Sequence, residues 1–72
     1  MDQRNVERLF AWLVLQVEAA YRDEIDMAMD CFVQESYTRE ELERFLEYVM
    51  ERVPDAEYDR VFDRVESELD KL

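Results

Sequence analysis

The amino-acid sequence predicts an all-α fold: a compact bundle of three or four short antiparallel helices in which the first helix is central. Three observations lead to this prediction. Apolar residues recur at spacings of three and four along most of the chain, which is the period of an α-helix. The sequence has no glycine and one proline, which disfavours tight hairpins and glycine-rich loops. Its hydrophobic content of 49% is too high for a disordered chain despite the charge. We expect residues 1–72 to form one acidic domain without an internal repeat.

The first helix is expected over residues 3–21, around the most apolar stretch of the chain. At about 100° per residue, one face carries Val6, Leu9, Phe10, Leu13, Val17 and Ala20. Trp12 and Val14 widen this face beyond the stripe of about 100° that a surface helix needs. A face this wide indicates either the central helix of a bundle or a helix that also meets another chain.

A second helix is expected over residues 24–36, with Asp23 as its N-cap. The polar cluster at residues 22–24 interrupts the apolar pattern, and a continuous helix would shift the apolar face by roughly 80° at this point. The new inner face is formed by Ile25, Ala28, Met29 and Phe32. One continuous, bent helix is the alternative, because neither glycine nor proline marks the break.

The clearest local signal is a capping box, in which the Thr38 hydroxyl accepts a hydrogen bond from the Glu41 amide. Tyr37 and Leu42 occupy the two positions of a hydrophobic staple around it. The third helix is therefore expected over residues 39–53, and Pro54 ends it because the residue before a proline disfavours the α region. Its apolar face consists of Leu42, Phe45, Leu46, Val49, Met50 and Val53.

The fourth helix is expected over residues 55–71, with Asp55 as its cap. Its apolar face consists of Tyr58, Val61, Phe62, Val65, Leu69 and Leu72. The turns between the predicted helices are short, so neighbouring helices should run antiparallel.

The residue types in the chain exclude most catalytic and metal chemistry. Without histidine, no Ser–His or Cys–His nucleophile pair and no histidine metal site is available. The single cysteine, Cys31, cannot form a thiolate zinc site or a disulfide within one chain. We therefore expect no enzymatic activity, no metal and no cofactor, and a reducing, cytoplasmic setting. The apolar run in the first helix is too short for a signal peptide or a membrane span.

The net charge of −11, from 20 acids and 9 bases, makes nucleic acids and anionic membranes poor partners and a basic protein surface a good one. The acids form stripes along three predicted helices. The second helix carries Asp23, Asp26 and Asp30, the third carries Glu40, Glu43, Glu47 and Glu51, and the fourth carries Asp59, Asp63, Glu66 and Asp70. Like charges four residues apart cost a few tenths of a kcal/mol per pair, so helix stability alone does not favour this layout.

Such stripes can imitate a nucleic-acid backbone. One stripe carries a charge about every 6 Å, roughly a quarter of the density of duplex DNA, so two or three stripes must share a surface to approach it. The leading hypothesis is therefore a small acidic inhibitor that occupies the basic, nucleic-acid-binding surface of a partner protein. In size and charge the chain resembles antirestriction and anti-CRISPR proteins of phages, and also bacteriocin immunity proteins, although no motif carries the resemblance further.

Two alternatives remain open. The chain can be a structural or assembly subunit, as a homodimer or with a neutral partner, that uses an apolar surface around Trp12, Leu15 and Met27. In that case the acidity only keeps the protein soluble or adapts it to high salt. It can also be an antitoxin or immunity-type partner of a basic toxin, which differs from the leading hypothesis only in the identity of the partner.

Overall fold

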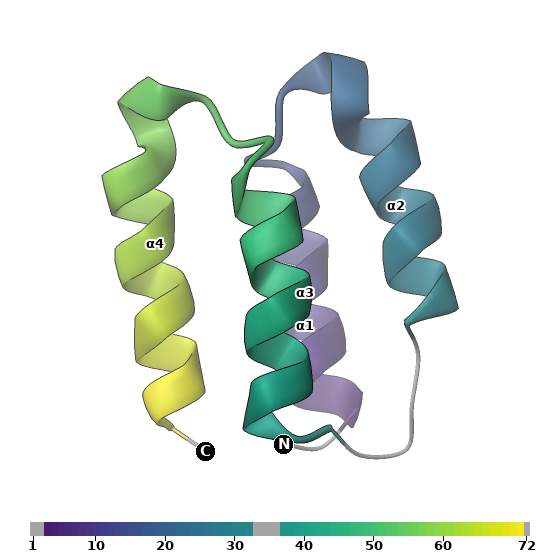
Figure 1. Cartoon of the computed structure of the whole chain (residues 1–72), viewed down its shortest axis with the longest axis vertical. Helices are drawn as coiled ribbons and strands as arrows, with labels where there is room; N and C mark the ends of the chain where they lie inside the picture. The colour runs from purple at the N-terminus through teal and green to yellow at the C-terminus, as the bar shows by residue number, and fades with distance from the viewer. Residues whose placement is uncertain (1–2, 33–36, 72) are drawn as a thin grey trace.

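The computed structural model describes residues 3–32 and 37–71, and these residues form helices joined by short turns (Figure 1). The helices are α1 (Gln3–Val14), the short 3₁₀ helix η1 (Ala19–Tyr21), α2 (Arg22–Cys31), α3 (Arg39–Met50) and α4 (Asp55–Asp70). No strand occurs among the described residues. The all-α prediction is confirmed, and the radius of gyration of 11.4 Å matches the value of about 11 Å expected for a compact chain of this length.

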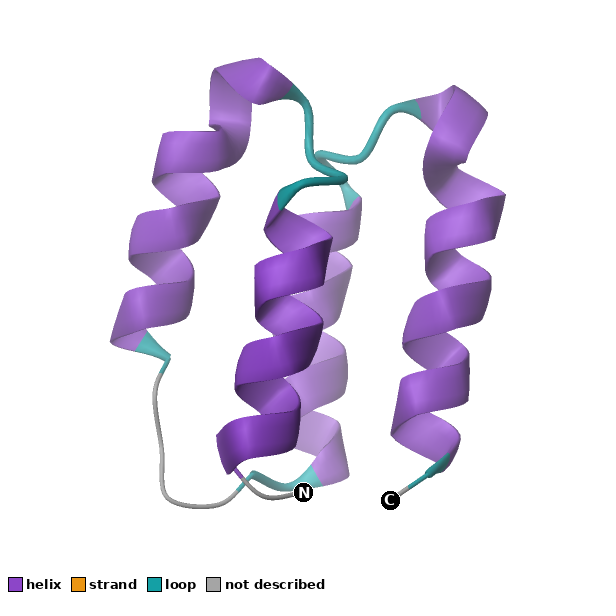
Figure 2. Cartoon of the chain, turned by 180° about the vertical axis from the view of Figure 1, so that it is seen from behind, coloured by secondary structure: helices purple, strands orange, loops and turns teal. Residues whose placement is uncertain are grey.

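The four α-helices lie with α1 and α3 in the middle and α2 and α4 on either side (Figures 1 and 2). Helix α1 contacts both α2 and α4, and α3 contacts α4. The apolar faces of all four helices meet in one cluster, because each helix must bury its stripe against its neighbours. This core consists of Val6, Leu9, Phe10, Leu13, Val17, Ile25, Met29, Tyr37, Leu42, Leu46, Val49, Met50, Val53, Val61, Val65 and Leu69.

The prediction of one helix over residues 3–21 is wrong at its C-terminal end, because α1 ends at Val14. Val17 is buried, as its place on the apolar face predicts, but it lies in the turn that follows. The Arg22 guanidinium donates hydrogen bonds to the carbonyls of Val17 (3.2 Å) and Leu15 (3.1 Å), and so satisfies acceptors beyond the end of the helix. The break therefore comes seven residues earlier than expected, and the turn is held by a side chain from the next helix.

The second predicted helix starts within two residues of the expected place but is capped differently. Helix α2 begins at Arg22, its N-cap residue is Tyr21, and no side-chain capping bond is present there. Asp23, the predicted cap, lies in the first turn of the helix. Helix α2 ends at Cys31, and the predicted continuation to residue 36 falls on residues 33–36, outside the described part of the chain.

The capping prediction for the third helix is confirmed, since the Thr38 hydroxyl accepts a hydrogen bond of 3.2 Å from the Glu41 amide. The end of this helix is not where it was expected, because α3 stops at Met50 rather than at residue 53. Pro54 is the N-cap residue of α4, and Asp55, the predicted cap, is the first residue inside the helix. The predicted start of α4 at residue 55 is correct.

The structure contains an internal repeat of 36 residues, contrary to the expectation from the sequence. A shift of 36 residues superposes the bounds of α1 on those of α3, and the turn after α1 on the turn after α3. The buried pairs that correspond are Val6 and Leu42, Phe10 and Leu46, Leu13 and Val49, Val17 and Val53, Ile25 and Val61, and Met29 and Val65. The chain is therefore two copies of one helical hairpin, α1–α2 and α3–α4.

The turns of the two hairpins have the same backbone geometry. Glu18 has φ −54° and ψ 140°, and its counterpart Pro54 has φ −55° and ψ 140°. The amide of Gln16 donates to the Leu13 carbonyl at 2.9 Å, and the equivalent amide, of Arg52, donates to the Val49 carbonyl at 3.0 Å. The repeat thus extends from the core into the hydrogen bonds of each turn.

Side chains between the hairpins repeat in the same way. Gln16 donates from Nε2 to a carbonyl one turn earlier (3.3 Å) and accepts at Oε1 from Arg60 of the other hairpin (2.8 Å). Its counterpart Arg52 donates to the equivalent carbonyl (2.9 Å) and to Glu24 of the other hairpin (3.2 Å). Each hairpin therefore contacts the other through equivalent positions, as in an arrangement with two-fold symmetry. Figure 2 shows the molecule from behind, and the pattern of two inner and two outer helices is the same there as in Figure 1.

Candidate functional site

A groove of 310 Å³ runs between α3 and α4. Its apolar lining comes from Leu46 and Met50 on α3 and from Val65 and Leu69 on α4. Acidic side chains stand on both helices beside this lining, namely Glu43, Glu47 and Glu66. An apolar floor with carboxylates on both rims can bind an apolar anchor and cations together.

Two aromatic side chains of α4 complete the groove, and they are the residues that the sequence placed wrongly in the core. Tyr58 is 39% exposed and Phe62 is 41% exposed, and their rings stack with centroids 6.0 Å apart. Helical spacing puts Phe62 at the edge of the apolar face that borders the acidic stripe. That position next to the acids is the signal in the sequence that could have marked it as a surface residue.

Arg39 binds a carboxylate from each of the two helices beside this groove. Its guanidinium lies 2.9 Å from Glu43 on α3 and 3.3 Å from Asp70 on α4. The hydrogen bond to Glu43, followed by the one to Asp70, raises the pKa of Arg39 above its ordinary value. The α3–α4 edge therefore already holds one cation between two carboxylates.

Acids from two predicted stripes meet at this groove, namely Glu43 and Glu47 on α3 and Glu66 on α4, whereas Asp26 and Asp30 of the α2 stripe do not line it. Four of the predicted acids are in ion pairs: Glu40 with Arg44 (2.7 Å), Glu51 with Arg52 (3.7 Å), and Glu43 and Asp70 with Arg39. The others have no ion pair with a cation in residues 3–32 and 37–71: Asp23, Asp26, Asp30, Glu47, Asp59, Asp63 and Glu66. Most of the negative surface charge is thus available to a partner.

The basic side chains of α4 are in ion pairs with acids outside the stripes. Arg60 pairs with Glu57 at 2.9 Å, and both Arg64 and Lys71 lie within 3.5 Å of Glu68. These pairs stand three or four residues apart on α4, where opposite charges stabilise a helix.

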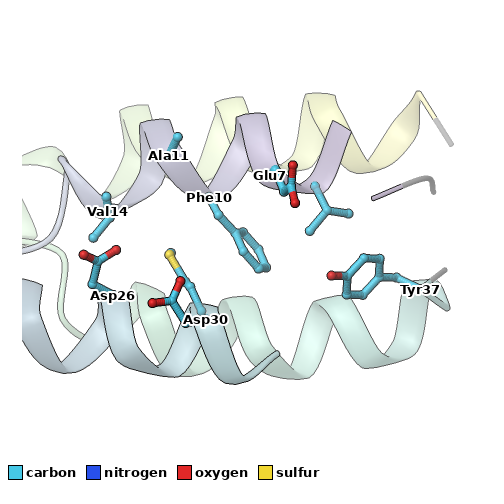
Figure 3. Close-up of a pocket in the computed structure, with 9 residues that line it drawn as sticks. Glu7, Phe10, Ala11, Val14, Asp26, Asp30 and Tyr37 are labelled. Atoms are coloured by element: carbon cyan, nitrogen blue, oxygen red, sulfur yellow. The ribbon is translucent and has the colours of Figure 1, made fainter. Parts of the chain in front are cut away.

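A second groove, of 290 Å³, lies between α1 and α2 (Figure 3). Phe10, Val14 and Met29 belong to its apolar lining, together with Val6, Ala11 and Tyr37. Glu7 on α1 and Asp26 and Asp30 on α2 supply its carboxylates. Asp26 and Asp30 of the α2 stripe therefore lie beside this second groove and not beside the α3–α4 groove.

The three apolar residues predicted to meet a partner are not equally accessible. The Trp12 ring is half-buried, with the Arg64 guanidinium 5.1 Å from its centroid, so it is partly covered within the chain. Leu15 and Met27 are 63% and 70% exposed. Trp12 therefore takes the packing role that the sequence left open, while Leu15 and Met27 remain surface residues.

No helix in the described part of the chain combines the length and apolar character that crossing a membrane requires. Comparison with models of known protein families finds none that matches this sequence, and no curated protein and no solved structure matches it either.

Proposed function

We propose that this protein is a non-enzymatic binding module for a basic protein surface, and more specifically a small acidic inhibitor that occupies a surface where its partner otherwise binds nucleic acid. The single observation that carries the proposal is the juxtaposition on α3 and α4 of two acidic stripes with an apolar groove between them. Charge complementarity would steer a basic partner to this face, and the groove would add affinity that does not depend on salt.

The geometry favours partial rather than complete imitation of a duplex. Each stripe carries a charge about every 6 Å, so two adjacent stripes reach at most about half the charge density of duplex DNA. Four of the eight acids in the α3 and α4 stripes are in ion pairs, which lowers this density further. The α2 stripe lies beside the other groove and adds nothing to this face. The partner surface should therefore be one that combines arginine or lysine with exposed apolar side chains.

We also propose the finer arrangement, an antiparallel bundle in which α1 is central. It is supported by the contacts of α1 with both α2 and α4 and by the alternating course of successive helices in Figure 1. Contacts between α1 and the two outer helices in an NMR nuclear Overhauser experiment would test it. A cytoplasmic site is part of the same proposal, because the lone Cys31 suits a reducing compartment.

The test is capture of partners from a lysate on the immobilised protein, with elution by a salt gradient and identification by mass spectrometry. We expect a basic nucleic-acid-binding protein to elute between about 0.1 and 0.5 M salt, as screening sets in, and duplex DNA to compete for it. Capture of neutral proteins that stay bound at high salt would contradict the proposal.

Two variants of equal charge sharpen this test. Glu47→Lys with Asp63→Lys changes the stripes of α3 and α4, and Glu18→Lys with Asp55→Lys changes exposed acids outside all three stripes. Each pair takes the net charge from −11 to −7, because each substitution changes the charge by two. We expect the first pair to lose capture and the second to keep it, with both variants folded by circular dichroism. Equal losses would show that only the overall charge matters.

The exposure of Leu15 and Met27 favours a second candidate, a homodimer or an assembly subunit that binds a neutral partner. Changing both to serine should then abolish self-association in analytical ultracentrifugation, while the Glu47→Lys and Asp63→Lys pair leaves it intact. An antitoxin or immunity role would give the same results as the leading proposal, with a basic toxin as the captured protein.

A further inference from the structure

We propose that the internal repeat gives this protein two equivalent docking grooves, each of which binds an amphipathic basic helix, so that one chain binds two copies of one partner segment. This inference rests on the proposed binding of basic proteins and specifies its stoichiometry and the shape of the bound segment. It starts from the observation that the two grooves are not independent features of the surface.

The linings of the two grooves correspond position by position under the shift of 36 residues. Seven positions of the α1–α2 groove have counterparts that line the α3–α4 groove. In order, Glu7, Phe10, Ala11, Val14, Asp26, Met29 and Asp30 correspond to Glu43, Leu46, Glu47, Met50, Phe62, Val65 and Glu66. The volumes, 290 and 310 Å³, are nearly equal. The two hairpins therefore form two equivalent grooves.

The chemistry of the two sites is shared where a ligand would meet them. The first helix of each hairpin supplies a glutamate to the rim, Glu7 or Glu43, and the second helix supplies Asp30 or Glu66. Each groove has three carboxylates in all, and apolar side chains lie between them. Of the acids on the two rims, only Glu43 has an ion pair with a cation among the described residues. The other five carboxylates are therefore available to pair with the lysines or arginines of a basic segment.

A helix fits these grooves better than an extended segment. The backbone amides and carbonyls of the groove helices form hydrogen bonds within their own helices. They are therefore not available to pair with the backbone of an extended segment. A helix satisfies its own backbone and can place an apolar stripe on the groove floor. Carboxylates on two opposite rims then require lysine or arginine on both flanks of that stripe. Glu43 and Glu47 are separated by about 6 Å along the axis of α3. Basic residues four positions apart on a docked helix have the same spacing.

Arg39 shows within the chain how such a cation would be held. It lies between a carboxylate of α3 and one of α4, with N–O distances of 2.9 and 3.3 Å. A partner arginine reaching over the groove would meet the same kind of pair, such as Glu47 on α3 and Glu66 on α4.

The two grooves lie on different hairpins. Figures 1 and 2 show the outer helices of these hairpins, α2 and α4, on opposite sides of the inner pair α1 and α3. One partner helix therefore does not block the other. The occupant we assign is the same basic segment in both grooves, from two chains of one partner or from a partner that is itself a symmetric dimer.

The experiment titrates the ¹⁵N-labelled full chain with a synthetic amphipathic peptide of about four helical turns, with leucines on one face and lysines on both flanks. Isothermal titration calorimetry gives the stoichiometry, and amide shifts locate the peptide. We expect two equivalents per chain, with shifts along both grooves, and at least tenfold weaker binding of a scrambled peptide of the same composition. One equivalent, shifts outside the grooves, or equal binding of the scrambled peptide would overturn the inference.

The repeat supplies matched variants. Glu7→Lys with Asp30→Lys should remove one equivalent, and Glu43→Lys with Glu66→Lys the other. Glu18→Lys with Asp55→Lys has the same change in charge at exposed acids that line neither groove and belong to no acidic stripe, and it should keep two equivalents. A single equivalent confined to α3–α4 overturns the doubling but leaves the proposed function standing. The proposed function fails instead if capture of a basic protein is insensitive to salt, whatever the peptide does.

Discussion

Phe10 and Phe62 lie on apolar helix faces in the sequence, yet the structure gives them opposite environments. Phe10 is buried, and its ring centroid lies 5.2 Å from that of Phe45 and 6.1 Å from that of Phe32. Phe62 is 41% exposed and stacks on Tyr58 beside the α3–α4 groove. Replacing each with alanine should therefore show how the stability cost differs between a buried and a partly exposed phenylalanine.

The expected costs follow from these surroundings. Truncating a buried phenylalanine costs about 3–5 kcal/mol, because transfer energy and cavity energy add. A chain of this length has a free energy of unfolding of about 4–11 kcal/mol, so Phe10→Ala should remove between about a quarter and all of that stability at 25 °C. Phe62→Ala removes a side chain that is only partly covered and leaves no closed cavity. Its cost should be about 1 kcal/mol, with a decrease in melting temperature of about 4–8 °C.

Urea denaturation followed by far-ultraviolet circular dichroism measures both costs in one assay. We expect a large loss of stability for Phe10→Ala, and a small one for Phe62→Ala with the slope of the transition unchanged. The same Phe62→Ala protein should bind the amphipathic peptide more weakly in the α3–α4 groove. Equal costs for the two substitutions would refute the reasoning, since they would place both rings in one core.

Four further predictions concern interactions outside the core. Arg52→Ala should lower the free energy of unfolding by about 1–2 kcal/mol in urea denaturation, because the guanidinium lies 4.2 Å from the Tyr48 ring centroid and bonds the Tyr48 carbonyl and Glu24. Arg44→Ala, which breaks only an exposed pair within α3, should cost less than about 0.5 kcal/mol. Thr38→Ala should cost about 1 kcal/mol and Thr38→Ser much less, since serine keeps the capping oxygen; equal losses would contradict a capping role. Raising sodium chloride from about 0.05 to 0.5 M should increase the melting temperature in calorimetry, because screening weakens the repulsion within a chain of charge −11; a decrease would show that ion pairs dominate.

The features that the sequence predicted correctly are those set by short-range chemistry. Thr38 is followed three residues later by Glu41, and the structure has the expected bond between them. The apolar period of three and four identified the buried residues of α1 and α3, including Val17 and Val53 in the turns. In both cases the deciding residues are within a few positions of each other, so no knowledge of the tertiary structure was needed.

The end of α1 could not be predicted in this way because its turn carries no local signal. Pro54 marks the second turn, but its counterpart Glu18 adopts the same φ and ψ without a proline or a glycine. The Glu18 amide donates to the Arg52 carbonyl at 3.0 Å, so a contact from the other hairpin helps to hold this turn. Aligning the two halves would have transferred the break from Pro54 to Glu18. That alignment is hard to see, because few of the paired residues are identical, among them Glu7 and Glu43.

The grooves were missed for a related reason. Helical spacing places Tyr58 and Phe62 on the apolar face of α4, but it does not say how much of that face a neighbour covers. The facing side of α3 offers Leu46 and Met50, which are buried, and leaves the outer edge of the α4 face open. Coverage depends on how the helices pack, which the period of one helix does not determine.

The difference between Glu18 and Pro54 also has a consequence for the order in which the chain folds. Proline fixes φ before folding, so the α3–α4 turn loses less conformational entropy than its counterpart, and the Thr38 cap starts α3 locally. The α1–α2 turn has no proline, and no threonine cap precedes α1 in the described residues. The Glu18 amide in this turn donates a hydrogen bond to the carbonyl of Arg52, which lies in the other half of the chain. We therefore expect α3–α4 to form first in the transition state and α1–α2 to assemble on it, with higher φ-values at Val49 and Val61 than at their counterparts Leu13 and Ile25. Two hairpins of the same structure would then have different kinetic roles because only one of them has a proline in its turn and a capping threonine before its first helix.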